Sequence, residues 1–395
     1  VAIRRRNLIR DDAYPYTSPA NMRFEGLSHH ASLDKLMGLI DYDALRADQA
    51  AARARGVHRG LGIASFIELT NPSPFMYGIG GARISAQDGC TVRMDPDGSI
   101  VALSGVTEQG QGTEAMLSQV VAEGVGVDVA QVRVITGDTQ VTPYGGGTWA
   151  SRGAGIGGEA ALRAGIALRG SILEVAGAML QAPVDTLDVQ GGAVVDKATR
   201  AERITLAELG RVVYFRGDTL PKELPRELVQ TRHYITSDYP FAFTNGVQAS
   251  YLEVDIETGF VKLLKHWCVE DCGRVINPQL VDEQIRGGIV QGIGGALYEE
   301  CLYDGEGQLL NANMADYLVP MAGEMPDMII GHVETPTRES LLGAKGAGEA
   351  GTAGAPAAIM NAINDALRPL GARVTEMPFT PERILTALGT VPGRI

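Results

Sequence analysis

The sequence predicts a fold that mixes helices with short strands, and three patterns carry this prediction. Alternating or continuous apolar runs over residues 61–70, 90–94 and 246–273 are typical of strands. Apolar residues at helical spacing over 276–300 and 353–367 are typical of buried helices. The 50 glycines fit many tight turns and close approaches of backbone to a ligand.

Size and composition bound the class of protein. A chain of 395 residues should form two or three compact units, and 45% hydrophobic with 21% charged residues indicates a globular protein. The net charge of -13 argues against a nucleic-acid partner, which would need a basic face. No apolar run is long enough for a membrane span. Four irregularly spaced cysteines fit neither a disulfide framework nor a tetrathiolate site, so a reducing, cytoplasmic setting is expected.

The first quarter of the sequence is predicted to form one long helix followed by strands. The helix begins at Ser32 or Asp34 and ends at Gly56. The adjacent His29 and His30 are expected to point to different sides of a strand. After the strand at 61–70, three shorter strands are predicted at 82–86, 90–94 and 99–106, with a hairpin turn at 95–98.

Two glycine-rich loops each run into a helix. Residues 109–112 precede a helix near Thr113, and residues 145–158 precede a second, longer helix. The first N–H groups of a helix lack partners within it and favour an anion. Because neither the P-loop pattern nor an ordered dinucleotide fingerprint is present, the loops indicate some other phosphate-bearing cofactor.

Beyond residue 185 the chain returns to short elements. A helix is predicted near 206–213, a surface crossing at 221–225, and two strands within 246–273 joined by a turn at 257–259. His266 is interpreted as a packed strand residue, because no second histidine stands at metal-ligand spacing, and no protein-ligated zinc is expected.

The helix over 276–300 should begin at Asn277 and Pro278. Its glycines at 287, 288, 292, 294 and 295 are attributed mainly to tight packing on a sheet. Strands near 308–310 and 328–333 follow.

One carboxylate stands in a loop with almost no side chains. Glu349 lies within residues 343–354, where five glycines and four alanines allow close backbone approach. Screened from water by a ligand, such a carboxylate would serve as a general base. The alternative, a solvated charge in the first turn of a helix, fits this stretch equally well.

Four segments stand together in one order: residues 109–114, 137–152, 270–278 with 284–294, and 343–349. Their combination resembles the molybdenum-cofactor subunit of the xanthine oxidase family, and most of all its carbon monoxide dehydrogenase branch. The resemblance implies an α+β fold, a cofactor-binding domain of several small mixed sheets flanked by helices. It also implies a domain division into residues 1–85 and 86–395, with a possible subdomain break near 215–240.

The resemblance implies a molybdenum–molybdopterin cofactor, usually in its cytosine dinucleotide form, whose metal is held by the pterin dithiolene and not by protein side chains. Glu349 would be the catalytic base beside the metal. The residues implied to bind the cofactor are Gln109, Gly110, Gln111, Gly112, Gly147, Thr148, Trp149, Ala150, Ser151, Arg152, Asp271, Cys272, Gln284, Lys345, Gly346, Ala347 and Gly348. Ser151 and Arg152 would hold the pyrophosphate.

The implied reaction is oxidative hydroxylation of a small-molecule substrate, an aldehyde or an N-heterocycle, with oxygen from water. The Ala350–Gly351 pair after Glu349 differs from the pair in xanthine and carbon monoxide enzymes and leaves the substrate open. Electrons would leave through 2Fe-2S and FAD centres on iron–sulfur and flavin partner chains. The chain matches only the C-terminal half of the family's subunit, so an N-terminal half is expected as a separate chain or missing part. A carbon monoxide dehydrogenase-type fragment, a non-catalytic assembly module and a binder of another phosphate ligand are the alternatives.

Overall fold

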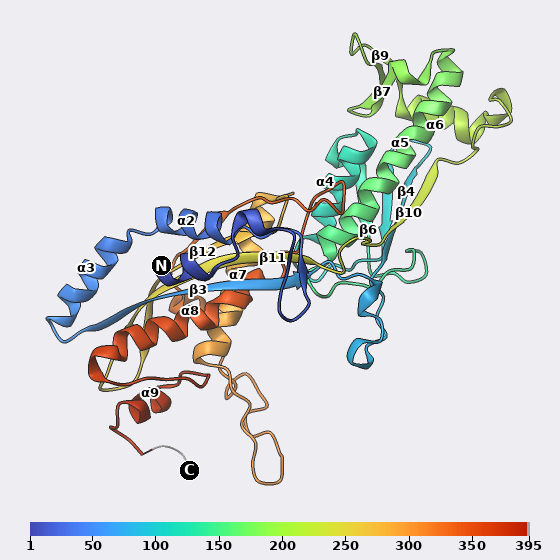
Figure 1. Cartoon of the computed structure of the whole chain (residues 1–395). Coiled ribbons are helices and arrows are strands. Elements are labelled where there is room, and N and C mark those ends of the chain that lie inside the picture. Colours follow the sequence, from blue (N-terminus) through green and yellow to red (C-terminus); the bar gives the residue numbers. More distant parts are fainter. Residues whose placement is uncertain (393–395) are drawn as a thin grey trace.

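The computed structural model describes residues 1–392, which form two helix-covered four-stranded sheets, an outlying three-stranded sheet and a two-stranded sheet (Figure 1). The helices are α1 Ala2–Asn7, α2 His29–Leu39, α3 Tyr42–Arg53, α4 Thr113–Val125, α5 Glu159–Leu180, α6 Leu206–Phe215, α7 Pro278–Leu297, α8 Ala350–Leu367 and α9 Pro381–Ala387. The strands are β1 Tyr16–Thr17, β2 Arg23–Phe24, β3 His58–Thr70, β4 Asp88–Met94, β5 Ile100–Ser104, β6 Val132–Ile135, β7 Leu187–Gln190, β8 Ala193–Asp196, β9 Glu202–Thr205, β10 Val229–Tyr234, β11 Ala242–Val254, β12 Val261–Asp271 and β13 Met328–His332.

The first sheet has the strand order β13-β12-β11-β3 and joins segments from both ends of the chain. Long β3 and β11 run antiparallel, with Thr70 opposite Ala242 and His58 opposite Val254. The second sheet, β10-β4-β5-β6, carries α4 and α5, and the β7-β8-β9 sheet with α6 forms the far tip in Figure 1. This mixture of small sheets and helices confirms the predicted α+β class.

Helix α8 lies directly on the backbone of β3. A Cβ on Gly60 would come within 1.9 Å of the Ala362 carbonyl oxygen, and one on Gly62 within 2.0 Å of the Ala358 oxygen. Only glycine allows this approach. The contact brings the start of α8 to the end of β3, whereas α2 packs on the opposite face of the sheet (Figure 1).

Two of the five glycines of α7, Gly288 and Gly292, are explained by packing on α8, and not on a sheet as predicted. A Cβ on Gly288 would lie 3.0 Å from the Gly351 Cα, and one on Gly292 would lie 2.9 Å from the Ala355 Cβ. Gly287 and Gly295 have open space instead, so helix contact does not account for them.

Several predicted elements differ from the structure. The helix expected from Ser32 or Asp34 to Gly56 is two helices, because the side chain of Asp41 caps α3 by accepting from Ala44 N at 3.0 Å. His29 and His30 open α2 and do not lie in a strand. Residues 82–86 and 308–310 form no strand, and the latter contribute only an isolated bridge between Tyr303 and Leu309.

The predicted domain division stays a prediction. The sheets themselves group residues 58–70 with 242–332 and set residues 88–234 apart. None of the helices within residues 1–392 combines the length and apolarity that crossing a membrane requires.

Candidate active site

The loop over residues 343–349 is held by the ends of three strands. Gly346 N donates to Thr70 Oγ1 at 3.2 Å, and Thr244 Oγ1 donates to Gly346 O at 2.5 Å. Lys345 N donates to Cys272 O at 2.7 Å. Since β3, β11 and β12 all contribute, the sheet fixes the path of the loop up to Glu349.

A second loop lies against the first at Ser151. A Cβ on Gly346 would come within 2.1 Å of the Ser151 carbonyl oxygen, so the glycine is required by close approach. Ala150 and Ser151 both have left-handed backbone, with φ of 46° and 49°. Two such residues in a row are unfavourable without glycine and are often found at functional sites.

Ser151 joins two carboxyl groups. Its Oγ lies 2.8 Å from Glu349 Oε2 and 2.5 Å from Glu68 Oε1. Glu349 N also donates to the same Oγ at 3.1 Å. Glu68 is 9% exposed, and burial, together with the nearby Glu349 carboxylate, raises its pKa to about 8.

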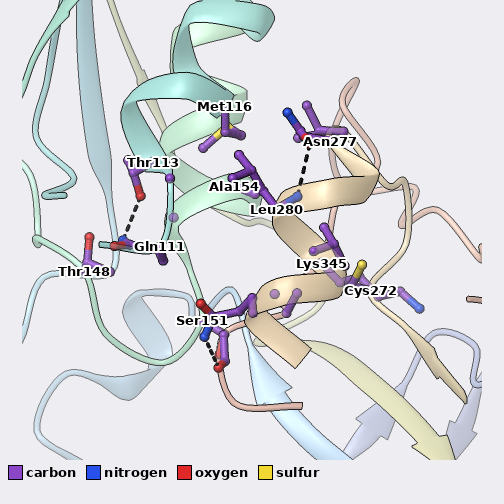
Figure 2. Close-up of a pocket in the computed structure, with 18 of the residues that line it drawn as sticks. Gln111, Thr113, Met116, Thr148, Ser151, Ala154, Cys272, Asn277, Leu280 and Lys345 are labelled. Carbon is purple, nitrogen blue, oxygen red and sulfur yellow. Dashed lines mark hydrogen bonds between the residues drawn. The ribbon is translucent and has the colours of Figure 1, made fainter. Parts of the chain in front are cut away.

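A pocket opens beside these groups where three helical segments begin (Figure 2). They are α4, α7 and the π-helical turn Gly153–Gly158 that leads into α5. Helix N-termini carry partial positive charge, so this convergence suits an anion. The wall between them is apolar and consists of Met116, Ala154, Ile276, Leu280 and Val281.

Lys345 places a buried positive charge in the wall of this pocket. The residue is 4% exposed, and its Nζ lies 3.8 Å from Asp271 Oδ1. Within residues 1–392 this Nζ has no hydrogen-bond partner. A buried ammonium without hydrogen bonds is costly, and an anion bound in the pocket would remove that cost.

Most of the predicted cofactor residues lie around the pocket or an adjoining hollow. The pocket, of about 140 Å³, is lined by Gln111, Gly112, Thr148, Ser151, Cys272, Gln284, Lys345, Gly346, Ala347 and Gly348. The adjoining hollow, of about 460 Å³, adds Gln109, Gly110, Trp149, Ala150 and Glu349. Gln284 Nε2 donates to Gly348 O at 2.7 Å and so ties α7 to the loop.

Arg152 was predicted to hold the pyrophosphate of the cofactor, but its side chain points away from the pocket. Its side chain is fully buried, and it pairs with Asp88 at 2.8 Å and donates to Gly147 O and Gln87 O. Burial lowers the pKa of Arg152 and raises that of Asp88. The guanidinium therefore anchors the loop from behind and does not line the pocket.

Asp271 also lies behind the pocket wall, and Gly147 lines neither hollow. Asp271 is fully buried, and its Oδ1 accepts from Gly273 N at 2.9 Å and Thr335 N at 3.0 Å. It supports the turn after β12 and faces Lys345.

The N-terminus of α4 already holds a carboxylate of this chain. Glu108 accepts from the backbone N–H groups of Gly110 at 2.8 Å, Gly112 at 3.1 Å and Glu114 at 3.0 Å. Burial raises the pKa of Glu108, but these N–H groups outweigh burial and leave the pKa below its usual value. Glu108 therefore occupies part of the set of N–H groups that was expected to be free for a phosphate at this helix.

A buried polar chain holds the start of α8. Gln248 Nε2 donates to Ala350 O at 3.2 Å and Gly351 O at 2.9 Å, so its Oε1 accepts from His266 Nε2–H. His266 Nδ1 then accepts from the Ser250 hydroxyl at 2.7 Å. Burial lowers the pKa of His266 to about 3 and keeps the ring neutral, which confirms its reading as a packed strand residue.

Sequence reasoning missed Glu68 and the apolar wall of the pocket. The one available signal for Glu68 was an acidic residue within the apolar run 61–70. The apolar wall carried no signal, because Met116, Leu280 and Val281 fit equally well into ordinary helix cores.

Comparisons with known proteins identify the family of this chain. Residues 35–326 match the family model of the molybdopterin cofactor-binding domain. The nicotine 6-hydroxylase large subunit of Paenarthrobacter nicotinovorans is 38% identical over 98% of this chain and 47% of its own length. The carbon monoxide dehydrogenase large chain of Hydrogenophaga pseudoflava is 30% identical over 98% of this chain and 48% of its own length.

A solved structure shows the same fold. Quinoline 2-oxidoreductase from Pseudomonas putida 86 superposes with a TM-score of 0.90 at 34% identity, over 99% of this chain and 49% of that one. The chain thus spans about half the length of the relatives it matches. With a family model that covers most of its residues, this chain belongs to the molybdopterin cofactor-binding domain family of the xanthine oxidase and carbon monoxide dehydrogenase large subunits.

Proposed function

We propose that this chain is the part of a molybdenum hydroxylase large subunit that binds the cofactor and supplies the catalytic base, Glu349. The proposal depends mainly on the position of Glu349, which lines the second hollow directly after Gly348, a residue that lines both hollows. Molybdopterin binding is the property of the family to which the chain belongs.

The residues present fit an anionic, phosphate-bearing group. Lys345 offers a buried ammonium without a hydrogen-bond partner among the described residues. Gln109 to Gly112, Ser151, Gln284 and Lys345 to Gly348 would hold the cofactor. The apolar wall at Leu280 and Val281 suits a flat ring, either the pterin or the cytosine of a dinucleotide form.

The bound molybdenum would supply the two-electron oxidation of the substrate. Glu349 does the acid–base work of this chain. Ser151 binds Glu349 Oε2, so Oε1 remains available to accept a proton. Gln248 and His266 fix the first turn of α8 and with it the position of Glu349.

The names of two relatives favour an N-heterocycle as substrate. Nicotine and quinoline, the compounds named in the relatives at 38% and 34% identity, are both N-heterocycles. The remaining length of these relatives supports an N-terminal region, on the same or a separate chain, that completes the substrate side. Iron–sulfur and flavin partners would carry the electrons away.

Glu349→Gln tests the assignment of the base. The isosteric amide cannot accept a proton, and a general base contributes roughly 100- to 10,000-fold to the rate. We expect kcat to fall by at least about 100-fold, while the molybdenum content of the natively purified complex stays unchanged. Glu123→Gln, an exposed change on α4, is the matched control. Turnover close to that of the control would remove Glu349 from the mechanism, and a native complex without molybdenum and iron would overturn the proposed function itself.

A further inference from the structure

Three polar groups meet at the single hydroxyl of Ser151. Glu68 Oε1 and Glu349 Oε2 lie 2.5 and 2.8 Å from Ser151 Oγ, and Glu349 N lies 3.1 Å from it. All three distances are within hydrogen-bond range.

The number of hydrogen atoms available at Ser151 Oγ limits how many of the two carboxyl groups can be ionised. A serine hydroxyl has one proton to donate and two lone pairs that accept. Glu349 N–H occupies one lone pair, and the hydroxyl proton can go to only one carboxylate. The contact with the other carboxyl group is a hydrogen bond only if that group carries its own proton. Two ionised carboxylates therefore do not fit this arrangement.

Burial decides which carboxyl group is neutral. Glu68 is 9% exposed, and its Oε2 has no hydrogen-bond partner within the part of the chain that the structure describes. Glu349, by contrast, is exposed. The charged groups that face Glu68 are Glu349 ahead of α8 and Glu270 on β12, both acidic. Burial and negative neighbours disfavour a charge on Glu68, in line with its pKa of about 8.

We propose that Glu68 is a positioning residue that carries a proton at neutral pH and donates it to Ser151 Oγ, so that Ser151 donates its own proton to an ionised Glu349. In this arrangement every hydrogen and lone pair at Ser151 Oγ is used. The consequence for catalysis rests on the proposed function. Neutral Glu68 then orients the charged Glu349 through Ser151. It does so without placing a second negative charge beside Glu349.

Infrared titration of the purified full protein, with any chains that co-purify, tests the protonation state without using turnover. We expect a carbonyl band of a protonated carboxylic acid that persists at pH 7 and disappears with a midpoint near pH 8. The band should be absent in Glu68→Gln and unchanged in Glu174→Gln, an exposed change on α5. In Ser151→Ala the band should remain and shift in frequency, because its acceptor is lost. A spectrum at pH 7 in which Glu68→Gln removes no such band would overturn the proposal.

Activity of the complete complex tests the positioning role. Glu68→Gln keeps a donor for Ser151 and should retain kcat within about threefold, whereas Glu68→Leu removes the donor. Misplacing a catalytic group costs up to about 100-fold, so we expect kcat of Glu68→Leu to fall by about 10- to 100-fold with KM little changed. Loss in Glu68→Gln as large as in Glu68→Leu would contradict positioning by hydrogen bonding.

The two experiments separate this proposal from the proposed function. If Glu349→Gln left turnover intact, the base assignment would fail, but the infrared band of Glu68 would still report its proton. If the band were missing while Glu349→Gln abolished turnover, only the inference about Glu68 would fail.

Discussion

At the scale of single residues, the buried acid Glu68 couples the stability of the fold to pH. Its folded pKa of about 8 lies above the value of 4.5 expected for an unfolded chain. Between these two values the unfolded state releases a proton that the folded state keeps. The free energy of unfolding therefore falls as pH rises from about 4.5 to about 8 and levels off above that.

Glu68→Gln should remove this dependence. We expect the variant and the unchanged protein to have similar stability near pH 4, and the variant to be more stable above pH 8. The gain should reach a few kcal/mol, because one pKa unit corresponds to about 1.4 kcal/mol. Thermal melts from pH 4 to 9 measure the difference, with Glu174→Gln as control. A stability difference that does not change with pH would mean that Glu68 titrates normally.

The sequence identified residues by their loops and missed the contacts between distant segments. Glu349, Ser151 and Lys345 were found because glycine-rich loops mark close approach, and all three line the hollows. Arg152 was assigned to the same surface as its neighbours, but its partner Asp88 lies on β4, 64 residues earlier. The local sequence does not reveal the direction in which a side chain points from a strained loop. That direction depends on the partner that the side chain meets in the tertiary structure.

At the scale of elements, two neighbouring glycines of α7 should behave in opposite ways. Gly287 is exposed with open space at its Cβ position, whereas a Cβ on Gly288 would lie 3.0 Å from the Gly351 Cα of α8. Helical Gly→Ala in open space stabilises by roughly 0.5–1 kcal/mol. Gly288→Ala should instead destabilise, because the backbones of α7 and α8 must separate.

Urea unfolding of the two variants measures both effects. Because Gln284 on α7 binds Gly348 O, separation of the helices by Gly288→Ala should also lower molybdenum content, which Gly287→Ala should leave unchanged. Equal stability changes for the two variants would show that α7 and α8 do not pack tightly at this point.

The sequence predicted most elements, because their apolar periods and caps are local. Asn277 and Pro278 marked the start of α7, and Asn277 Oδ1 does accept from Leu280 N at 3.1 Å. The prediction of one helix over residues 32–56 was wrong because the helical pattern continues across the break at Ile40 and Asp41, and the nearby Gly38 lies within α2. The pairing of β3 with β11 could not be predicted from the sequence, because it joins strands separated by more than 170 residues.

At the scale of the whole molecule, the pocket lies where the two main sheets meet. One wall comes from α4 and the turn before α5, which belong with the β10-β4-β5-β6 sheet. The other wall comes from α7 and residues 345–348, which belong with the β13-β12-β11-β3 sheet. A ligand in the pocket therefore contacts both units and adds contacts between segments far apart in sequence.

Loading with cofactor should slow backbone hydrogen exchange on both walls together. Protein from cells able and unable to make the pterin can be compared by mass spectrometry, because exchange reports local opening. We expect slower exchange in the loaded protein over residues 109–113, 148–154, 277–284 and 345–348. The small sheet β7-β8-β9 lies at the far tip of the molecule and serves as the internal control (Figure 1). Slowing on one wall alone would contradict a shared site, because a ligand seated between the units must reduce the opening of both.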